Sequence, residues 1–409
     1  MTQSVATSGQ PGIDDGLAAI RNAILAVAEH IAAEAVERER NDLSAEPRVR
    51  ELAAAGLGRI RVPVEFGGGG GHISDLADVL ITLAAADSNF VQIFRGHFGF
   101  IELLIDQEPD PVRDELLRAA GRGELFGPAA SVHAAGTSGG PAPTTIIDSS
   151  TRLDTEGDQT FLSGTKYYTT GSLFADWIAA LALTENGITE VVVNRNDPGV
   201  RVVDDWNGFG QRRTASGTTH FDRVPVRDGY AFPRSSGPID NYLAAFYQFI
   251  HSTTQAGILR RATDDLAIFV QRRVRSYPLA TDPSPRHDPQ VLEVVGEVAT
   301  AAYSTDAAVR ALAAAFDRYN ATSAATDLDA VLLASAATQV LNTRLSGEAT
   351  WRLFDAASAS ATDSALALDR HWRNARTISS HNPVIYKARA IGEYTVNGAF
   401  PDAFAGVHA

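Results

Sequence analysis

The spacing at which apolar residues recur changes twice along this chain of 409 residues. Apolar residues recur every three or four positions up to about residue 120, every second position from about 125 to 232, and every three or four positions again after Pro238. A period near 3.6 is typical of amphipathic helices, and a period of two is typical of half-buried strands. The sequence therefore predicts a helical region, a β region and a second helical region.

A glycine run interrupts the first helical region. The apolar stripe of its first helix includes Ile20, Ile24 and Ile31. Further on, Pro63 and the five glycines at 67–71 end a helix, because proline lacks the amide hydrogen and glycine favours turns. Five glycines in a row match no phosphate-loop pattern. We expect a turn between two helices here.

The central region has the alternation of strands. The segments RLDTEGDQTFLSGTKYYTT and THFDRVPVRD alternate in polarity, while DWIAALALT and EVVVNRN are short apolar runs, and Gly, Asn and Asp separate them. Such segments are typical of strands joined by tight turns. We expect one antiparallel β domain of roughly a hundred residues.

Long apolar stripes at helical spacing fill the last region, and a proline-dense link, SYPLATDPSPRHDPQ, separates its first two helices. Long helices with apolar stripes pack as bundles. The sequence predicts an α+β fold with an N-terminal helical domain, a central antiparallel β domain and a C-terminal four-helix bundle. The expected boundaries are 14–122, 123–235 and 236–398, with tails at 1–13 and 399–409.

Composition excludes several classes of protein. The chain has no cysteine, hence no disulfide and no thiolate metal ligand. Its formal net charge of −14 is unsuited to a nucleic acid partner. The histidines show no metal-ligand spacing, so we predict no metal site. We expect a cytoplasmic protein with no membrane partner, because there is no run of about 18 apolar residues and no signal-peptide pattern.

Four segments resemble the acyl-CoA dehydrogenase-like flavoproteins. They are LAAAGLGRIRVPVEFGGGG, LSGTKYYTTGSLFADWIAA, SGTTHFDRVPV and WRNARTISSHNPVIYK. Their order and spacing match the family over nearly the whole chain, and the family fold has the same order of helical, β and helical domains. The resemblance places Tyr168 and Thr170 against the flavin ring. A hydroxyl there can hydrogen-bond the ring edge, and an aromatic side chain can shield it; without the resemblance, YYTT reads as an ordinary strand.

The chain lacks the base that dehydrogenases of this family use. Aligning Arg373 with the family segment that carries this base puts Asn382 where a glutamate is expected, and an amide cannot accept the proton. Some members carry the glutamate on the first long helix of the bundle. The corresponding segment YQFIHSTT, residues 247–254, contains no acid.

The same C-terminal segment is similar to the branch of two-component flavin monooxygenases typified by dibenzothiophene monooxygenase. The matching residues there run from Asp369 to Pro383, and further agreement comes from FRGHFGF, from the segment around Trp206 and from RRVRSYP. The resemblance implies an enzyme that inserts one oxygen atom from O2 into a small organic substrate, at sulfur, nitrogen or aromatic carbon. A flavin C4a-hydroperoxide would carry that atom, and it must be kept dry and hydrogen-bonded.

The resemblance also implies the components of the site. His97, His381 and Thr170 would be the polar groups facing the reacting position, and Trp206 a further cofactor contact. Arg275 would bind the flavin phosphate from a neighbouring subunit of a homotetramer. The cofactor would be reduced FMN, with FAD as the alternative. A separate NAD(P)H-dependent flavin reductase would supply it, since the chain has no G-x-G-x-x-G nicotinamide fingerprint.

Two departures from this branch remove polar groups, Pro128 in place of an asparagine and Ile378 in place of a second histidine. The pocket would then hold a different or more apolar substrate, or another donor to the cofactor would take their place, with Ser131 and His133 as candidates. Other interpretations stay open: an acyl-CoA dehydrogenase-type enzyme with an unrecognised base, or a catalytically silent binding protein of the same fold. His97 could be a buried structural residue and His381 a helix-end or surface one. We assign structural roles to Arg370, Arg373 and Arg376.

Overall fold

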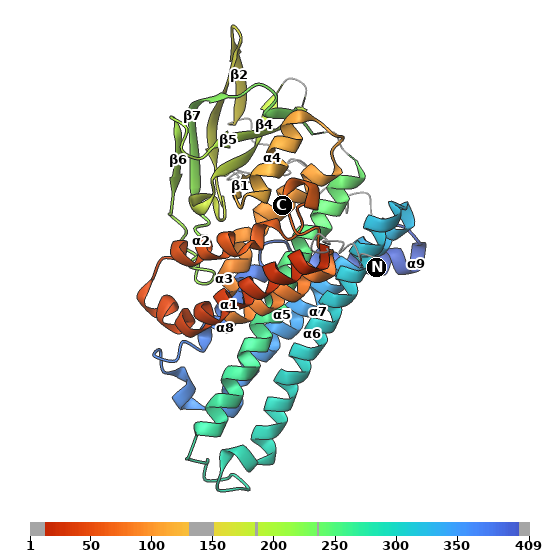
Figure 1. Cartoon of the computed structure of the whole chain (residues 1–409). Helices are drawn as coiled ribbons and strands as arrows, with labels where there is room; N and C mark the ends of the chain where they lie inside the picture. Colours follow the sequence, from red (N-terminus) through yellow and green to blue (C-terminus); the bar gives the residue numbers. More distant parts are fainter. Residues whose placement is uncertain (1–12, 131–150, 185–186, 235–236, 401–409) are drawn as a thin grey trace, which may run out of the picture.

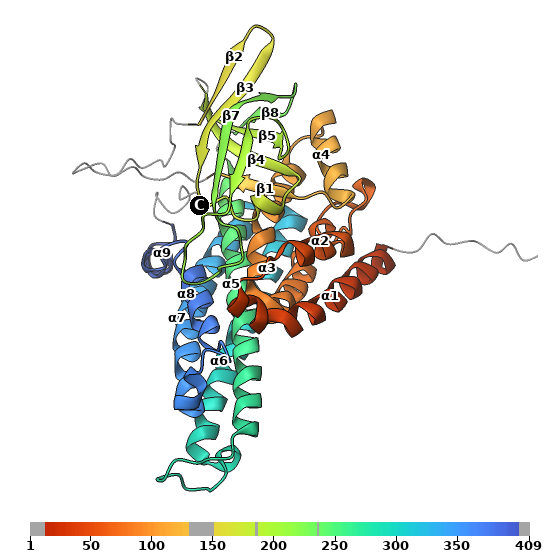
Figure 2. The same ribbon diagram turned by 90° about the vertical axis from the view of Figure 1, so that its left-hand side faces the viewer.

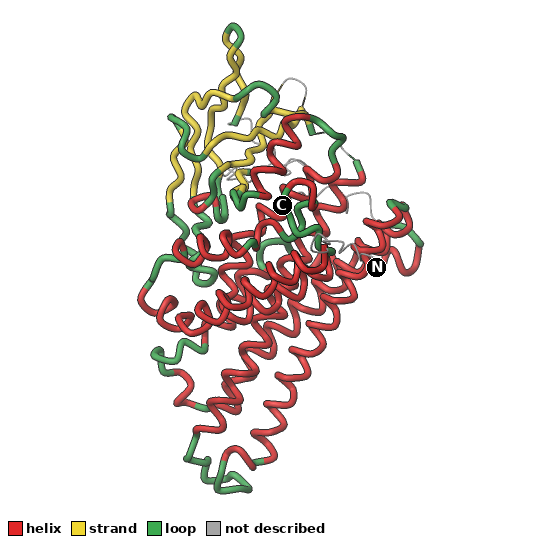
Figure 3. Tube along the Cα trace, viewed as in Figure 1, coloured by secondary structure: helices red, strands yellow, loops and turns green. Residues whose placement is uncertain are grey.

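The strands of this protein gather at one end of the molecule, and helices form the rest (Figures 1 and 3). The computed structural model describes residues 13–130, 151–184, 187–234 and 237–400. Along the chain, the α-helices α1–α4 precede the strands, and the α-helices α5–α9 follow them. The predicted order of helical, β and helical regions is confirmed.

The first helical region is built around one apolar helix, α3. Its helices are α1 (Ile13–Asn41), α2 (Glu46–Ala55), α3 (Ile73–Asp106) and α4 (Pro111–Gly121), with short 3-10 turns η1 (Leu57–Arg59) and η2 (Val64–Phe66). The predicted glycine turn lies before α3. Gly68 passes so close to Val62 that an added Cβ would lie 1.9 Å from the Val62 carbonyl oxygen. Only glycine allows two backbone segments to approach in this way.

Helix α3 is broken at Asp87, whose backbone is extended (φ −163°, ψ 116°). The Asp87 carboxylate accepts a hydrogen bond from the backbone nitrogen of Asn89 at 3.0 Å, which restarts the helix as an N-cap does. The buried guanidinium of Arg38 in α1 lies 3.0 Å from the same carboxylate. The break is therefore held in place by α1.

The β domain is one mixed sheet. Among the described residues its strands are β1 (Phe126–Ala129), β2 (Arg152–Glu156), β3 (Gln159–Lys166), β4 (Trp177–Thr184), β5 (Gly187–Asn194), β6 (Val200–Val203), β7 (Thr218–Val226) and β8 (Ala231–Pro233). The order is β6-β7-β3-β2-β4-β5-β8, with β1 beside β4. Most pairs are antiparallel as predicted. However, β1 and the first residue of β2 run parallel to β4, which long connections allow and tight hairpins do not.

Three long helices make up most of the second helical region, and they extend away from the sheet (Figure 1). The helices are α5 (Pro238–Arg272), α6 (Pro289–Thr322), α7 (Ala325–Ala357), α8 (Asp369–Ser379) and α9 (Ile385–Asn397), with turns η4 (Pro285–His287) and η5 (Ala359–Thr362). The proline-dense link joins α5 to α6, as predicted, at the tip farthest from the sheet. The link ends at Asp288, whose carboxylate accepts a hydrogen bond from the backbone nitrogen of Gln290 and caps the start of α6.

Helices α3 and α5 pack along each other and form the centre of the molecule. In Figure 2, α1 and α2 lie on one side of this pair, and α7 and α8 lie on the other. The main apolar core runs through α1, α3, the sheet and the first part of α5, and a second apolar cluster fills the far end of the bundle. The α3–α5 pair therefore joins the β domain to the bundle.

Two helices, α1 and α3, are long and apolar enough to cross a membrane by length and composition alone. Most of α3 is buried by the rest of the fold, as expected for a core helix. The apolar side of α1, which includes Ile24 and Ile31, packs into the main core. Both helices thus have partners within the fold.

Candidate active site

Three of the residues predicted to contact a cofactor lie together beside the sheet. Tyr168 and Thr170 belong to the turn that follows β3, and Trp206 belongs to the loop between β6 and β7. The Tyr168 and Trp206 rings meet edge to face, with centroids 6.2 Å apart. Tyr168 is 49% exposed and has a left-handed backbone (φ 56°). Such a conformation is strained for a bulky residue and is found mostly at functional sites.

Thr170 ends a chain of hydroxyl groups. Thr214 donates to the carbonyl oxygen of Gln211 at 2.8 Å, and its own oxygen lies 2.7 Å from the Ser216 hydroxyl. Ser216 in turn lies 2.8 Å from the Thr170 hydroxyl. Because each hydroxyl has one proton and can rotate, the Thr170 proton can point to Ser216 or to a molecule bound beside the turn.

The loop that carries Trp206 is attached to α8. The Asn374 side-chain oxygen accepts from the Gln211 backbone nitrogen at 2.7 Å, and the Phe209 and Trp372 rings stack with centroids 5.7 Å apart. Arg373 donates to the Phe209 carbonyl oxygen at 2.9 Å. The C-terminal motif RHWRNART therefore positions the Trp206 loop.

The other arginines of the motif agree with the structural roles assigned to them. Arg370 and His371 are both buried, and both contact the carboxylate of Asp265 in α5, at 2.6 and 2.8 Å. Arg373 also lies 2.6 Å from Glu39 of α1. Arg376 is exposed. These contacts join α8 to α5 and α1.

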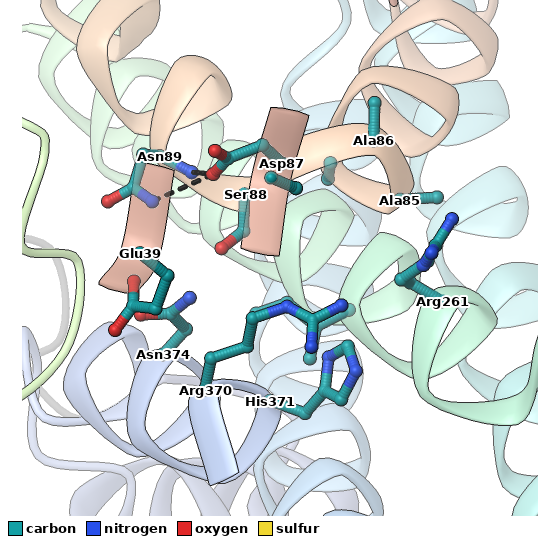
Figure 4. Close-up of a pocket in the computed structure, with 13 residues that line it drawn as sticks. Glu39, Ala85, Ala86, Asp87, Ser88, Asn89, Arg261, Arg370, His371 and Asn374 are labelled. Atoms are coloured by element: carbon teal, nitrogen blue, oxygen red, sulfur yellow. Dashed lines mark hydrogen bonds between the residues drawn. The ribbon is translucent and has the colours of Figure 1, made fainter. Parts of the chain in front are cut away.

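A small cavity lies where α8 meets the break in α3 (Figure 4). Its walls include Ser88, Asn89, Arg370 and Asn374. With a volume of about 20 Å³, it has room for about one water molecule and none for a cofactor. The cavity is part of the packing of α8 and lies apart from the reacting position considered below.

His97 is held by the backbone on both sides of its ring. Its Nε2 lies 2.7 Å from the Gly58 carbonyl oxygen, and its Nδ1 accepts from the Phe126 backbone nitrogen at 3.1 Å. The ring is neutral, with the proton on Nε2, since Nδ1 is an acceptor. Burial lowers its pKa to about 4. Both nitrogens are thus used to join α3, η1 and β1, and this gives no support to the predicted catalytic role.

A second polar group lies between α3, α5 and the end of α8. It consists of Arg95, Tyr247, His251 and His381. The Arg95 guanidinium lies over the Tyr247 ring, with Cζ 4.4 Å from the ring centroid. The His251 and His381 rings face each other with centroids 4.5 Å apart. Burial and the charge of Arg95 lower the pKa of both histidines, that of His381 to about 3.

His381 is the one predicted catalytic histidine that belongs to this group. His381 is exposed to solvent, while the His251 ring that it faces is buried, so His381 lies at the outer edge of this polar group. Gln339 of α7 donates to the carbonyl oxygen of the next residue, Asn382, at 3.2 Å. The position of His381 is therefore fixed from α7.

The two polar groups meet on α3. Gly171 lies so close to α3 that an added Cβ would be 2.3 Å from the Ile93 carbonyl oxygen, and Gly96 is in close contact with the Pro128 ring. The Ser172 hydroxyl donates to the Pro128 carbonyl oxygen at 2.9 Å. The turn with Tyr168 and Thr170, strand β1 and the Arg95 region thus surround one stretch of α3, and Pro128 presents an apolar ring there.

Arg275 lies far from both groups within this chain. It is exposed and follows α5, which continues for 25 residues after Tyr247. At 1.5 Å per residue this part of α5 spans about 37 Å. Ser131 and His133 lie outside the described residues. Among the residues that the structure does describe, no group of three or more His, Asp or Glu could hold a metal ion.

Arg95, Tyr247 and His251 were not among the residues predicted for the site. One signal for Arg95 was available, because a charged residue in the apolar stretch QIFRGHFGF is buried in α3 and must have a reason to be there. Tyr247 and His251 fall in the segment YQFIHSTT, for which the sequence indicated only the absence of an acidic residue. Their spacing of four puts both on one face of α5.

The domain order and the arrangement of the site define the fold of an acyl-CoA dehydrogenase-type flavoprotein. Three models of this family match the chain: the acyl-CoA dehydrogenase N-terminal domain at residues 17–124, the middle domain at 138–224 and the C-terminal domain at 249–385. The chain belongs to the acyl-CoA dehydrogenase family.

Relatives cover nearly the whole chain. A dibenzothiophene monooxygenase of Mycolicibacterium goodii is 26% identical over 90% of this chain and 91% of its own length. A probable FMNH2-dependent monooxygenase of Pseudomonas putida, SfnC, is 26% identical over 92% of this chain and 95% of its own length. The FMN-bound structure of TdsC from Paenibacillus sp. A11-2 superposes with a TM-score of 0.85 at 24% identity, over 93% of this chain and 98% of that one. The family and fold predictions are confirmed.

Proposed function

We propose that this chain is the oxygenase component of a two-component, reduced-flavin-dependent monooxygenase, as the sequence predicted. Relatives named as monooxygenases align over about nine-tenths of the chain, which supports this class over the other branches of the family. FMN is the cofactor that we assign, since the name of one of these relatives specifies FMNH2. The substrate class is a small organic molecule.

The observation that carries the proposal is the chemistry of the polar group between α3, α5 and the end of α8. Its ionisable groups are Arg95, Tyr247, His251 and His381, and no carboxylate among the described residues forms an ion pair with this arginine. A dehydrogenase needs a strong base at this place, and neutral histidines with strongly lowered pKa values are weak ones. The groups that remain suit the binding and protection of an oxygenating flavin.

The residues beside the sheet fit a flavin ring. The strained and half-exposed Tyr168, with Trp206 against its edge, offers an aromatic wall, and Thr170 offers a hydroxyl whose proton can turn away from Ser216. The flavin, once reduced, supplies the electrons with which one atom of O2 enters the substrate and the other leaves as water. The protein's part is to bind the ring, orient it and exclude water.

His381 is the group that we assign to proton handling. As a neutral imidazole it donates one N–H and accepts at its other nitrogen. A hydrogen-bond donor beside the flavin ring holds an oxygen-bound proton in place, which favours oxygen transfer over release of H2O2.

Partners follow from the same proposal. O2 and the organic molecule are the substrates, and a separate NAD(P)H-dependent flavin reductase supplies the reduced flavin. We place the protein in the cytoplasm, where such reductases have their nicotinamide substrate.

The position of Arg275 supports an oligomer. It lies at the end of α5 opposite to Tyr168, so it can reach a flavin phosphate only on another subunit. Val274, Tyr277 and Leu279 beside it are 67% to 87% exposed, which suits a surface that a second subunit covers. We propose a homotetramer in which each α5–α6 link completes the site of a neighbour.

A single-turnover experiment tests the oxygenase function. The protein is loaded with reduced FMN without oxygen and mixed with O2 and a panel of sulfur, nitrogen and aromatic compounds. An oxygenated product that contains one atom from 18O2 supports the proposal. Bleaching of oxidised flavin by an acyl-CoA without oxygen would identify a dehydrogenase, and failure to bind flavin in either redox state would identify a silent binding protein.

A further inference from the structure

We propose that Arg95 binds the acid group of an anionic substrate, so that the molecule oxygenated by this protein is a small organic oxyanion such as a carboxylate, a sulfinate or a sulfonate. The inference rests on the proposed function, because it names the substrate class of the same site. Arg95 would be a specificity-determining residue that contacts the acid group, while the atom to be oxygenated lies toward His381 and the flavin.

Arg95 differs from the other buried arginines of this fold in having no carboxylate partner. It is 7% exposed, and its Nε and Nη2 atoms have no hydrogen-bond partner. Arg38 and Arg370 are equally buried, and each has a carboxylate within 3.0 Å. Arg61 beside α3 is paired with Glu102 at 2.6 Å. Burying an unpaired cation is strongly unfavourable, so a fold that retains one has a use for its charge.

The fold holds this guanidinium in place by close packing. Its flat face rests on the Tyr247 ring at 4.4 Å, a contact that partly offsets the loss of water. Tyr247 can approach α3 only because residue 99 is glycine, since a Cβ there would lie 2.3 Å from the ring. Gly96, the residue after Arg95, leaves room for the Pro128 ring in the same way, because an added Cβ would lie 2.4 Å from that ring. Two glycines thus create the space in which one arginine is fixed.

Other unpartnered polar atoms come from the same helix faces. Gln92 lies one turn before Arg95, and its side-chain oxygen has no partner. On α5, both ring nitrogens of His251 lack a partner, as does the amide nitrogen of Gln255 one turn later. Each of these side chains is at most 5% exposed. Buried polar groups are normally hydrogen-bonded. The Gln255 amide nitrogen and one His251 nitrogen can donate, and the Gln92 oxygen and the other His251 nitrogen can accept, so this set indicates a bound polar molecule.

The charges of these four side chains favour a negative ligand. Arg95 is the cation, His251 and His381 are neutral, and Tyr247 keeps its proton because burial raises its pKa. An oxyanion accepts charge-assisted hydrogen bonds from a guanidinium, often two in parallel. A neutral substrate would leave the Arg95 charge uncompensated. These side chains therefore select for a substrate with an acid group.

Binding measurements separate anionic from neutral ligands. The probes are three pairs of similar shape: acetate and acetamide, benzoate and benzamide, benzenesulfonate and benzenesulfonamide. Each compound is titrated by calorimetry into the full-length protein in two states, with oxidised FMN bound and without flavin. For at least one pair the anion should bind about 10- to 100-fold more tightly, the range expected for a hydrogen bond to a charged group. In Arg95→Gln this preference should disappear.

Arg370→Gln is the matched control, since Arg370 is equally buried but paired with Asp265. It should lower the thermal midpoint and leave the anion preference intact. Arg95→Gln should not lower the midpoint when no anion is present, because it removes an unpaired buried charge. A large loss of stability in Arg95→Gln, with no anion preference in the wild type, would overturn the proposal and make Arg95 a structural residue.

The remaining outcomes distinguish this inference from the oxygenase function. Oxygenation of neutral compounds with equal affinity for both members of every pair would leave the function standing and refute the anion site. Anion binding that depends on Arg95, in a protein that oxygenates none of the compounds tested, would support the site and count against the function. Anion preference that persists in Arg95→Gln, with weaker FMN binding, would assign Arg95 to the cofactor and refute the inference.

Discussion

Asn374 in α8 holds the backbone of Gln211, 163 residues earlier in the chain, through a buried hydrogen bond of 2.7 Å. Gln211 belongs to the loop that carries Trp206, and its own side chain donates to Ser88 beside the break in α3. One amide group therefore ties the C-terminal motif, the β domain and the first helical region together at the edge of the proposed flavin site.

Loss of this bond should affect both stability and cofactor binding. In Asn374→Ala the Gln211 backbone nitrogen stays buried without a partner, which costs about 1 to 3 kcal/mol of unfolding free energy. The Trp206 loop loses its anchor, so the dissociation constant for FMN should rise. Urea unfolding and a flavin titration measure the two effects. Asn374→Asp keeps the acceptor oxygen and should retain more of the FMN affinity than Asn374→Ala. Equal losses of FMN affinity in both variants would show that the hydrogen bond to Gln211 does not support the flavin site.

His97→Ala should impair the fold and leave oxygen chemistry largely intact in the protein that remains folded. The change leaves the Gly58 carbonyl and the Phe126 amide unpaired in the interior and opens a cavity beside Phe98. A loss of about 2 to 5 kcal/mol is expected from these two effects. Chemical unfolding gives the free energy, and single-turnover product yield per bound flavin gives the coupling. If His97→Ala kept full stability and released much H2O2, His97 would have a catalytic role.

The buried histidines should make the protein less stable in mild acid. In the folded state the pKa of His97 is about 4, whereas an unperturbed histidine titrates near 6.5. Below 6.5 the unfolded chain therefore binds a proton that the folded chain does not, and stability falls as the pH drops from about 6.5 toward 4. The full contribution of His97 is about 3 kcal/mol, at 1.36 kcal/mol per pKa unit. The pKa of buried His251 is also lowered, so His251 contributes to the loss of stability in acid in the same direction.

Urea unfolding at pH 7.5, 5.5 and 4.5 checks this dependence. Carboxylates such as Asp265 titrate below the same range, so the informative quantity is the difference between the wild type and His97→Gln. The variant should lose less stability between pH 6.5 and 4 than the wild type. Parallel curves would show that His97 contributes nothing to the acid sensitivity.

His381→Ala should uncouple oxygen consumption from product formation. Reduced FMN should still bind and react with O2, because these steps depend on the turn with Tyr168 and Thr170. Loss of this hydrogen-bond donor should lower the rate of product formation by about 10²- to 10⁴-fold, as for other groups that hold or move a proton in the transition state. Stopped-flow measurement of H2O2 and product together tests this, and a fully coupled variant would make His381 structural.

Arg275→Ala should weaken the binding of reduced FMN by about 1.5 to 3 kcal/mol, as for a lost hydrogen bond to a charged group. The fold within one chain should be unaffected, since Arg275 is exposed. Because the contact is proposed to cross between subunits, dilution below the dissociation constant of the oligomer should weaken flavin binding in the wild type as well. An unchanged dissociation constant in the variant would remove Arg275 from the site.

The sequence predicted the fold well because periodicity is a local property. The strands, the long helices and the proline-dense link are all visible in segments of about ten to thirty residues. The parallel pairing of β1 with β4 was not visible, because a strand's alternation is the same whichever direction its neighbour runs.

The site was harder to predict because its residues gain their roles from distant partners. A catalytic role was predicted for His97, and its ring bonds to backbone atoms 39 residues before it and 29 after it, which no local pattern encodes. Arg95, two positions away, lacks a carboxylate partner, and only the packed structure reveals this. Tyr168 and Trp206 were proposed because the family resemblance named them, and their side-chain chemistry alone would also fit ordinary strands.

The pairing of α3 with α5 has a consequence for how this chain reaches its native state. Roughly 130 residues, the whole sheet among them, separate the end of α3 from the start of α5. Contacts between such distant segments form slowly, because a long loop must close first. During synthesis the apolar face of α3 is therefore exposed until the sheet has folded and α5 has followed. A chain arrested before Pro238 should aggregate or bind chaperones, and complete folding should be limited by the closure of this one helix pair.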